Sequence, residues 1–118
     1  MSPRETRAAL PLSSSTFYIL LALAGGDCHG YGVIKEVEAH TAGTVKLGPG
    51  TLYRLIKQLL SDGWIVEIEG DSLADAERRR YYRLTERGRA VAVAEAERLE
   101  ELVTIARQRS LLPSLAIG

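Results

Sequence analysis

The chain has 118 residues, a length that predicts one domain built around one hydrophobic core. Its 15 basic and 15 acidic residues balance, so net charge indicates no particular partner, and 46% hydrophobic residues argue against a disordered chain. The longest apolar run, residues 17–24, is far shorter than the roughly 20 residues of a membrane span, and we identify no signal-peptide cleavage site after it. Cys28 is the one cysteine, which excludes an internal disulfide and favours a cytoplasmic location.

The first predicted elements are an arm and two helices. Residues 1–12 contain two prolines and mixed charges, which predicts a loose N-terminal arm. The hydroxyls of residues 13–15 are suited to cap a helix over residues 16–24, which is apolar nearly all round and ends at Gly25. A second helix is predicted over residues 31–40, with Tyr31, Ile34 and Val37 as its buried stripe.

The third predicted helix has the clearest pattern. Pro49 suits its first position because the N–H that proline lacks would be unpaired there in any case. Gly63 stands where a left-handed C-terminal cap is expected. Apolar residues between them recur at helical spacing and predict one continuous core face: Leu52, Leu55, Ile56, Leu59 and Leu60.

After Gly63 the pattern changes from helical to alternating. Residues 64–69 predict a strand, residues 70–77 a polar, acidic loop, and residues 79–84 a returning strand. Three helices followed by a two-stranded hairpin is the order of a winged helix-turn-helix. We therefore expect a mainly α fold with a small β-hairpin.

A last helix is predicted to begin after Thr85, which can cap it. It is strongly charged except for one narrow apolar stripe, which predicts pairing with a second copy of the chain. The expected dimerisation residues are Ala92, Ala96, Leu99, Leu102, Val103 and Ala106. The resulting division is an arm (residues 1–12), a winged-helix DNA-binding domain (13–84), a C-terminal dimerisation helix (85–110) and a tail (111–118).

The charges are distributed unevenly along the chain. Residues 46–57 hold three basic residues and no acid, and residues 78–89 hold six arginines and one acid. Such segregation lets a neutral chain present a basic face to double-stranded DNA, and the N–H groups at a helix start attract phosphate. The alternative, in which the glycines only shape a turn and the polar face is solvated, stays open. The expected DNA-binding residues are Lys46, Gly48, Pro49, Gly50, Thr51, Tyr53, Arg54, Lys57, Arg78, Arg79 and Arg80.

Several runs together resemble the PadR family of bacterial transcriptional regulators. They are LGPGTLYRLIKQL at residues 47–59, DGWI at 62–65, RRYYRLTERG at 79–88 and HGYG at 29–32. The resemblance implies a homodimer that binds a pseudo-palindromic operator, usually to repress transcription. It also implies that the arginines of the hairpin lie along the flanking backbone or minor groove, and that the compact subgroup dimerises through its single C-terminal helix.

Some compact members of that family bind flat aromatic drugs through an aromatic side chain between the terminal helices. Residues 91–109 contain no aromatic residue, which weakens a multidrug-sensing role and leaves a small-molecule effector open as a further partner. Cys28, His29 and His40 match no common zinc spacing, and no nucleophile–base set indicates an enzyme, so we expect no metal, cofactor or catalysis. The rival hypothesis is a winged-helix module that binds another protein without sequence-specific DNA binding.

Overall fold

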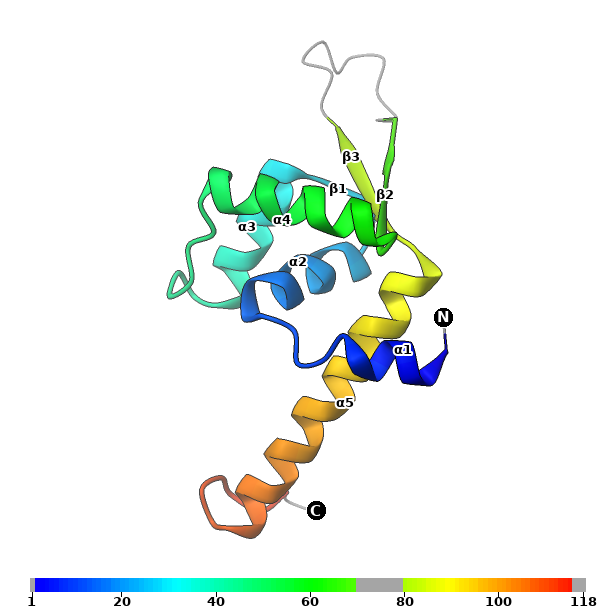
Figure 1. The fold of residues 1–118 in the computed structure, drawn as a ribbon. Coiled ribbons are helices and arrows are strands. Elements are labelled where there is room, and N and C mark those ends of the chain that lie inside the picture. The colour runs from blue at the N-terminus through cyan, green and yellow to red at the C-terminus, as the bar shows by residue number, and fades with distance from the viewer. Residues whose placement is uncertain (1, 70–79, 116–118) are drawn as a thin grey trace.

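The computed structural model describes residues 2–69 and 80–115 (Figure 1). A small three-stranded sheet accompanies the helices, which confirms the expected mainly α, winged helix-turn-helix class followed by a long C-terminal helix. The elements are α1 (Pro3–Ala8), α2 (Ser14–Ala24), β1 (Cys28–His29), α3 (Gly30–His40), α4 (Pro49–Asp62), β2 (Ile65–Ile68), β3 (Tyr81–Leu84) and α5 (Glu86–Gln108).

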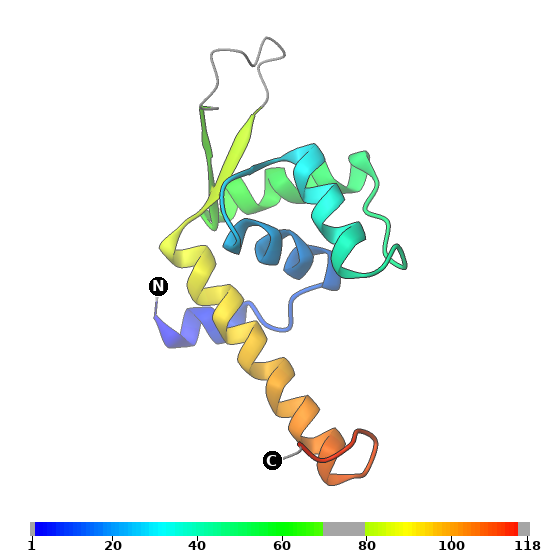
Figure 2. The ribbon, with the colours of Figure 1, turned by 180° about the vertical axis from the view of Figure 1, so that it is seen from behind.

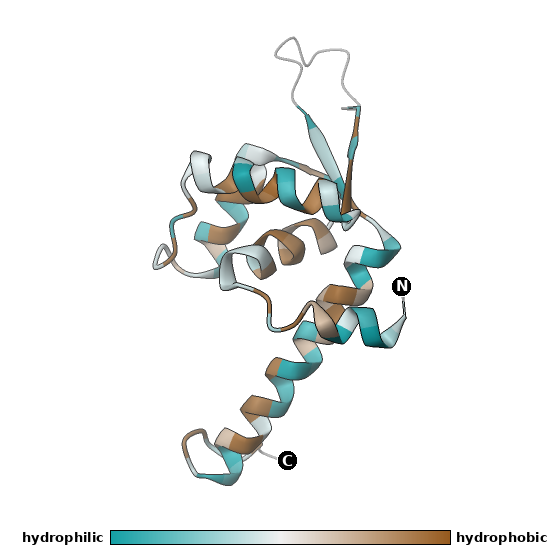
Figure 3. Ribbon diagram, viewed as in Figure 1, coloured by the Kyte–Doolittle hydropathy of each residue, from teal (hydrophilic) through white to brown (hydrophobic). Residues whose placement is uncertain are grey.

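The core surrounds α2, whose apolar character is visible in Figure 3. Ile19 and Leu20 are fully buried, and Leu23 is nearly so. Helices α3 and α5 and strand β3 pack directly on α2, while α4 packs on α3 and β2. A helix that is apolar on most of its surface can be stable only when neighbours cover it on several sides.

The sheet has three antiparallel strands in the order β1-β3-β2, where the sequence predicts two. The additional strand is β1, in which Cys28 lies opposite Tyr82 and His29 opposite Tyr81. A strand of two residues is too short to show alternation, so its pairing with β3 depends on tertiary contact.

The expectation of a loose N-terminal arm is wrong for α1. The hydroxyl of Ser2 accepts a hydrogen bond from the Glu5 N–H at 3.2 Å, and Pro3 occupies the first turn. Thr6 is buried where α1 packs on α5. Six residues are too few to form a stable helix alone, so α1 depends on this packing.

Two of the expected core stripes also need correction. The buried face of α3 contains Gly30, Val33 and Val37, and Tyr31 is 58% exposed. Steps of three residues from Tyr31 drift around a helix by 60° each, which moves Tyr31 away from the side of Val37. On α4, Leu52, Ile56 and Leu59 are buried as expected.

Leu60 was included in the predicted core face of α4, but it is 36% exposed at the edge of that face. The predicted ends of α4 are confirmed. Pro49 lies in the first turn, and Gly63 is the C-cap with a left-handed φ of 76°.

The start of α5 is attached to the turn between α4 and β2. The Thr85 hydroxyl donates to the carbonyl of Gly63 at 2.7 Å and accepts the N–H of Gly88 at 3.0 Å. The Thr85 N–H donates to the carbonyl of Trp64 at 3.0 Å. Gly88 lies so close to this turn that a Cβ atom there would overlap the Trp64 carbonyl oxygen.

We predict that Gly88→Ala lowers the free energy of unfolding by about 1–3 kcal/mol, because the overlapping atom belongs to the backbone and cannot rotate away. Urea denaturation followed by circular dichroism measures the change. Gly50→Ala is the matched control, since a Cβ there meets nothing within 4 Å. The control should be neutral or stabilising, by up to about 1 kcal/mol; equal losses in both variants would contradict the steric explanation.

Glu95 of α5 is 2% exposed and is bound from two directions. Its Oε2 accepts the N–H of Leu12 at 2.8 Å, and its Oε1 accepts the Nε–H of Arg98. Together with the Leu12 N–H, the Arg98 guanidinium lowers the pKa of Glu95 from the 4.5 usual for glutamate, although burial opposes the shift. The charged form of Glu95 is therefore the form that stabilises the fold.

A lowered pKa in the folded state means that this stabilisation is complete above about pH 4.5 and is lost as the pH falls through the folded-state pKa. We predict that Glu95→Gln lowers the free energy of unfolding by about 1–3 kcal/mol near neutral pH. The difference from the wild type should shrink below pH 4, when the wild-type carboxyl also becomes protonated. Urea midpoints across this range test it, and a difference that does not depend on pH would contradict the role of the charge.

Candidate nucleic-acid interface

The N-terminus of α4 is open to solvent. Gly48 is the N-cap and, having no side chain, makes no side-chain cap bond to the first-turn N–H groups. A Cβ at Gly48 or Gly50 would meet no atom within 4 Å, so the backbone here can be approached closely. Exposed N–H groups at the positive end of a 14-residue helix form a surface that favours an anion such as phosphate.

One face of α4 carries the expected polar residues, and all of them are exposed: Thr51, Tyr53, Arg54 and Lys57. Lys46, in the segment before the helix, is also exposed. Arg54 and Lys57 make no ion pair or side-chain hydrogen bond with the residues that the structure describes. Their charges are therefore available to a partner.

Tyr53 connects this face to the start of α3. Its hydroxyl lies against Gly30, where a Cβ atom would come within 2.7 Å of the Tyr53 oxygen. Tyr31 is exposed beside this point, and the Nζ of Lys35 lies 5.2 Å from the centre of the Tyr31 ring. The surface next to α4 thus contains an additional aromatic ring and an additional cation.

His29 continues these aromatic contacts to the sheet. The His29 ring is stacked on the Tyr31 ring, with 6.4 Å between the ring centres, and makes an edge contact with the Tyr81 ring, with 5.3 Å between the centres. Its Nδ1 accepts the N–H of Gly32 at 3.0 Å and so caps α3. Sequence reasoning did not assign Tyr31 and Lys35 to this surface because it placed Tyr31 in the core; the exposed Lys35 on the same helix was the available signal.

The hairpin of β2 and β3 rises beside the end of α4 (Figures 1 and 2). Arg80, which directly precedes β3 at the end of the hairpin remote from α5, is exposed, and its Nε lies 3.6 Å from Glu67 Oε1. The predicted contacts Arg78 and Arg79 lie outside the described residues. Arg83 is already paired, since it donates to both oxygens of Asp27 at 3.0 and 2.8 Å and lowers the pKa of that carboxyl.

The residues of the predicted apolar stripe on α5 differ in how deeply they are buried. Ala92 is buried in the core of the chain itself, and Leu99 and Ala106 are partly buried. Ala96 is exposed, while Leu102 and Val103 are 50% and 37% exposed. At 100° per residue, the six residues of the predicted stripe lie on one side of α5. This side faces the core in the first half of α5 and continues along the second half, beyond the body of the domain.

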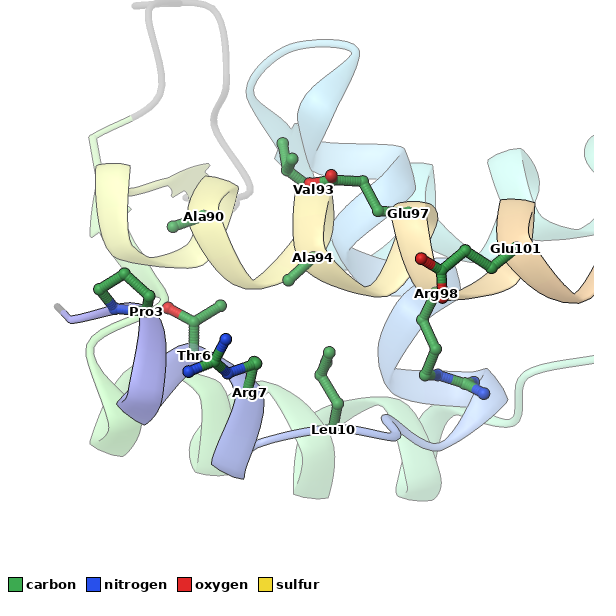
Figure 4. A pocket seen from close by; sticks show the side chains of 10 residues that line it. All are labelled: Pro3, Thr6, Arg7, Leu10, Ala90, Val93, Ala94, Glu97, Arg98 and Glu101. Atoms are coloured by element: carbon green, nitrogen blue, oxygen red, sulfur yellow. The ribbon is translucent and has the colours of Figure 1, made fainter.

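A groove lies along the junction of α1 and α5 (Figure 4). Leu10 points toward Ala94 across this groove, and Arg98 extends from α5 to the same side. Both apolar and charged side chains line the groove, among them Val93, Arg7 and Glu101. At 100° per residue, the α5 residues of the groove lie on the side of the helix opposite the apolar stripe.

Three observations on the described part of the chain concern metal ligands, membrane-spanning helices and the thiol of Cys28. No group of three or more metal-ligating side chains occurs among residues 2–69 and 80–115. None of the helices described there is long and apolar enough to cross a membrane. Burial, followed by the charge of Glu36, raises the pKa of the partly buried Cys28 thiol, which disfavours a reactive thiolate.

Comparison with known proteins decides the family. The profile of the transcriptional regulator PadR-like family matches residues 19–94. The chain belongs to the PadR-like family. The transcriptional regulator Rv3488 of Mycobacterium tuberculosis is 34% identical over 85 residues, which cover 72% of this chain and 75% of that protein. The family and this relative are both described as transcriptional regulators.

Solved structures share the fold. A transcriptional regulator from Clostridium thermocellum has a TM-score of 0.67 at 25% identity, over 89% of this chain and 96% of that one. The Bacillus subtilis PadR solved in complex with operator DNA has a TM-score of 0.60 at 18% identity, over 70% of this chain and 47% of the PadR chain.

Proposed function

We propose that this PadR-like regulator binds an operator in double-stranded DNA as a homodimer, with α4 of each copy in the major groove. The observation that carries the proposal is the exposed face of α4, where Arg54 and Lys57 have no acidic partner beside an uncapped helix N-terminus. A face that only met solvent would gain nothing from leaving two cations unpaired next to a positive helix end.

The residues divide into three roles in this proposal. Gly48, Pro49 and Gly50 bring the backbone close to phosphate, and Thr51 and Tyr53 reach phosphates or base edges from the first turn. Arg54 and Lys57, with Lys46, hold the backbone of the DNA. Arg80 acts at the flank of the site together with Arg78 and Arg79. The operator complex of the B. subtilis PadR, which shares the fold, supports this use of the fold.

Dimerisation is proposed to use the distal half of α5. The chain exposes there an apolar surface that its own core does not cover, at Leu102, Val103 and Ile105. Burying this surface against the same surface of a second copy gives two-fold symmetry, which a pseudo-palindromic operator requires. Two α4 helices about 34 Å apart would meet successive major grooves on one side of the duplex.

Repression is the proposed consequence of binding. A dimer that spans two successive major grooves competes with other proteins for the same stretch of promoter. Release by a small-molecule effector would require a ligand that favours a different arrangement of the two copies. The groove between α1 and α5, on the side of α5 opposite the pairing stripe, is the proposed site of such a ligand.

We predict that Arg54→Ala and Lys57→Ala each weaken binding to every duplex and lower the slope of log affinity against log salt by about 0.9. The reason is that each lost cation leaves one counterion on the DNA. Fluorescence anisotropy across a salt series measures both quantities. Arg4→Ala on α1 removes an exposed arginine away from α4 and should leave the slope unchanged. Unaltered slopes in both α4 variants would contradict the proposed face and favour the protein-binding alternative.

We predict that Leu102→Lys raises the dimer dissociation constant by at least about 100-fold, because each dimer loses two apolar contacts and gains two close positive charges. Sedimentation velocity over a concentration series measures this. Thr104→Lys adds the same charge on the opposite side of α5 and serves as the control. Leu102 is 50% exposed within one chain, so circular dichroism should show an intact fold. A Leu102→Lys protein that remains dimeric would remove this stripe from the interface.

A further inference from the structure

Glu95 is the one charged side chain that is buried among the residues the structure describes. Both of its oxygens are used, one by the N–H of Leu12 at 2.8 Å and the other by Arg98. Leu12 belongs to the connection between α1 and α2, directly before the α2 N-cap Ser13. Glu95 therefore ties α5 to the connection between α1 and α2, although Leu12 and Glu95 are 83 positions apart in the chain.

The position of Glu95 along α5 is as informative as its partners. The buried residues of α5 are Gly88, Val91, Ala92 and Glu95, in that order, and Glu95 is the last of them. Beyond it the helix leaves the body of the domain, as Figures 1 and 2 both show. Glu95 thus lies at the point about which the free half of α5 would tilt.

A small tilt at this point has a large effect at the far end. About 20 Å of helix follows Glu95, so a tilt of about 10° moves the end of α5 by about 3 Å. In a dimer joined by the distal halves, the same tilt moves each winged-helix body relative to its partner. The movement is comparable to the rise of about 3.4 Å for one base pair.

The hydrogen bond between Glu95 and Leu12 is directional, so it restricts the orientation of α5 as well as its distance from the connection between α1 and α2. The bond to Arg98 lies within α5 and orients the carboxylate that accepts the Leu12 N–H. Arg98 lies one turn further along α5 and is itself partly exposed, so its bond to Glu95 braces the carboxylate from the side of the free half.

We propose that Glu95 is a positioning residue: through its bond to Leu12, and with its carboxylate oriented by Arg98, it holds α5 at the angle that sets the distance between the two α4 helices of the dimer. The spacing of operator half-sites that the dimer accepts follows from this angle. The inference rests on the proposed function, since it requires dimerisation through α5 and, for its second consequence, DNA binding.

The first test measures the distance directly and needs no DNA. In a Cys28→Ser background, a spin label at Ser61→Cys reports the separation of the two α4 helices by double electron–electron resonance, because Ser61 is exposed near the end of α4. We expect one narrow distribution in the wild-type background and a distribution broadened or shifted by about 3 Å or more in Glu95→Gln. Glu100→Gln, an exposed carboxylate on the same helix, should match the wild type.

The second test measures the consequence for DNA. Duplexes selected by the wild type from a random pool are rebuilt with one or two base pairs added to or removed from the spacer. Wild-type affinity should fall by about tenfold or more on either side of one optimum, whereas Glu95→Gln should tolerate the altered spacers or shift its optimum. Arg98→Ala, which leaves the bond to Leu12 in place, should shift the profile in the same direction by less, and it replaces Glu95→Gln if that protein is too unstable.

The outcomes separate the two proposals. A dimer whose distance distribution and spacing profile are the same in wild type, Glu95→Gln and Arg98→Ala would overturn the positioning role while leaving DNA binding intact. A wild type that selects no duplex would overturn the proposed function and the spacing consequence. A changed distance in the variants would then still establish the positioning role within the dimer.

Discussion

The burial of α2 is the constraint on which the rest of the structure depends. Most side chains of α2 are apolar, including the buried Ile19, Leu20 and Leu23. The chain must therefore bring other elements against α2 from several sides. Helices α3 and α5 and strand β3 do so directly. Because α3 is held on α2, it carries α4 with it, and α4 turns its apolar face inward and its polar face toward solvent. The proposed DNA surface is therefore a consequence of how the core is closed.

The pairing of charges explains how a chain without net charge can present a basic surface. Among the described ion pairs, acidic residues neutralise arginines away from α4: Asp27 binds Arg83 on the sheet, and Glu95 binds Arg98 on α5. Arg54 and Lys57 have no such partner in the described part of the chain. The potential around α4 thus depends on which cations remain unpaired, and the composition alone does not reveal this.

The two halves of helix α5 have different roles, one in the core of the domain and one in the proposed dimer. Its first half contributes Val91 and Ala92 to the core, and its second half exposes Leu102 and Ile105 on a helix that has left the body. The transition occurs at Glu95, where directional bonds replace apolar packing. A single helix with these two halves would transmit any change at the interface of the copies to the position of α4. Such rigid coupling is one way in which a ligand bound between the copies could alter affinity for DNA.

Local patterns in the sequence by themselves determined much of this protein. The helical spacing after Pro49, the cap at Gly63, the hydroxyl of Thr85 and the alternation in the hairpin predict the winged helix-turn-helix order, because short-range periodicity and capping need no distant partner. The acid-free run at residues 46–57 likewise predicts the candidate DNA face. Only the tertiary structure decided the helical form of α1, the strand pairing of Cys28 and the burial of Glu95. Each of these depends on contact with residues far away in the chain, as between Leu12 and Glu95, and no local periodicity encodes such contacts.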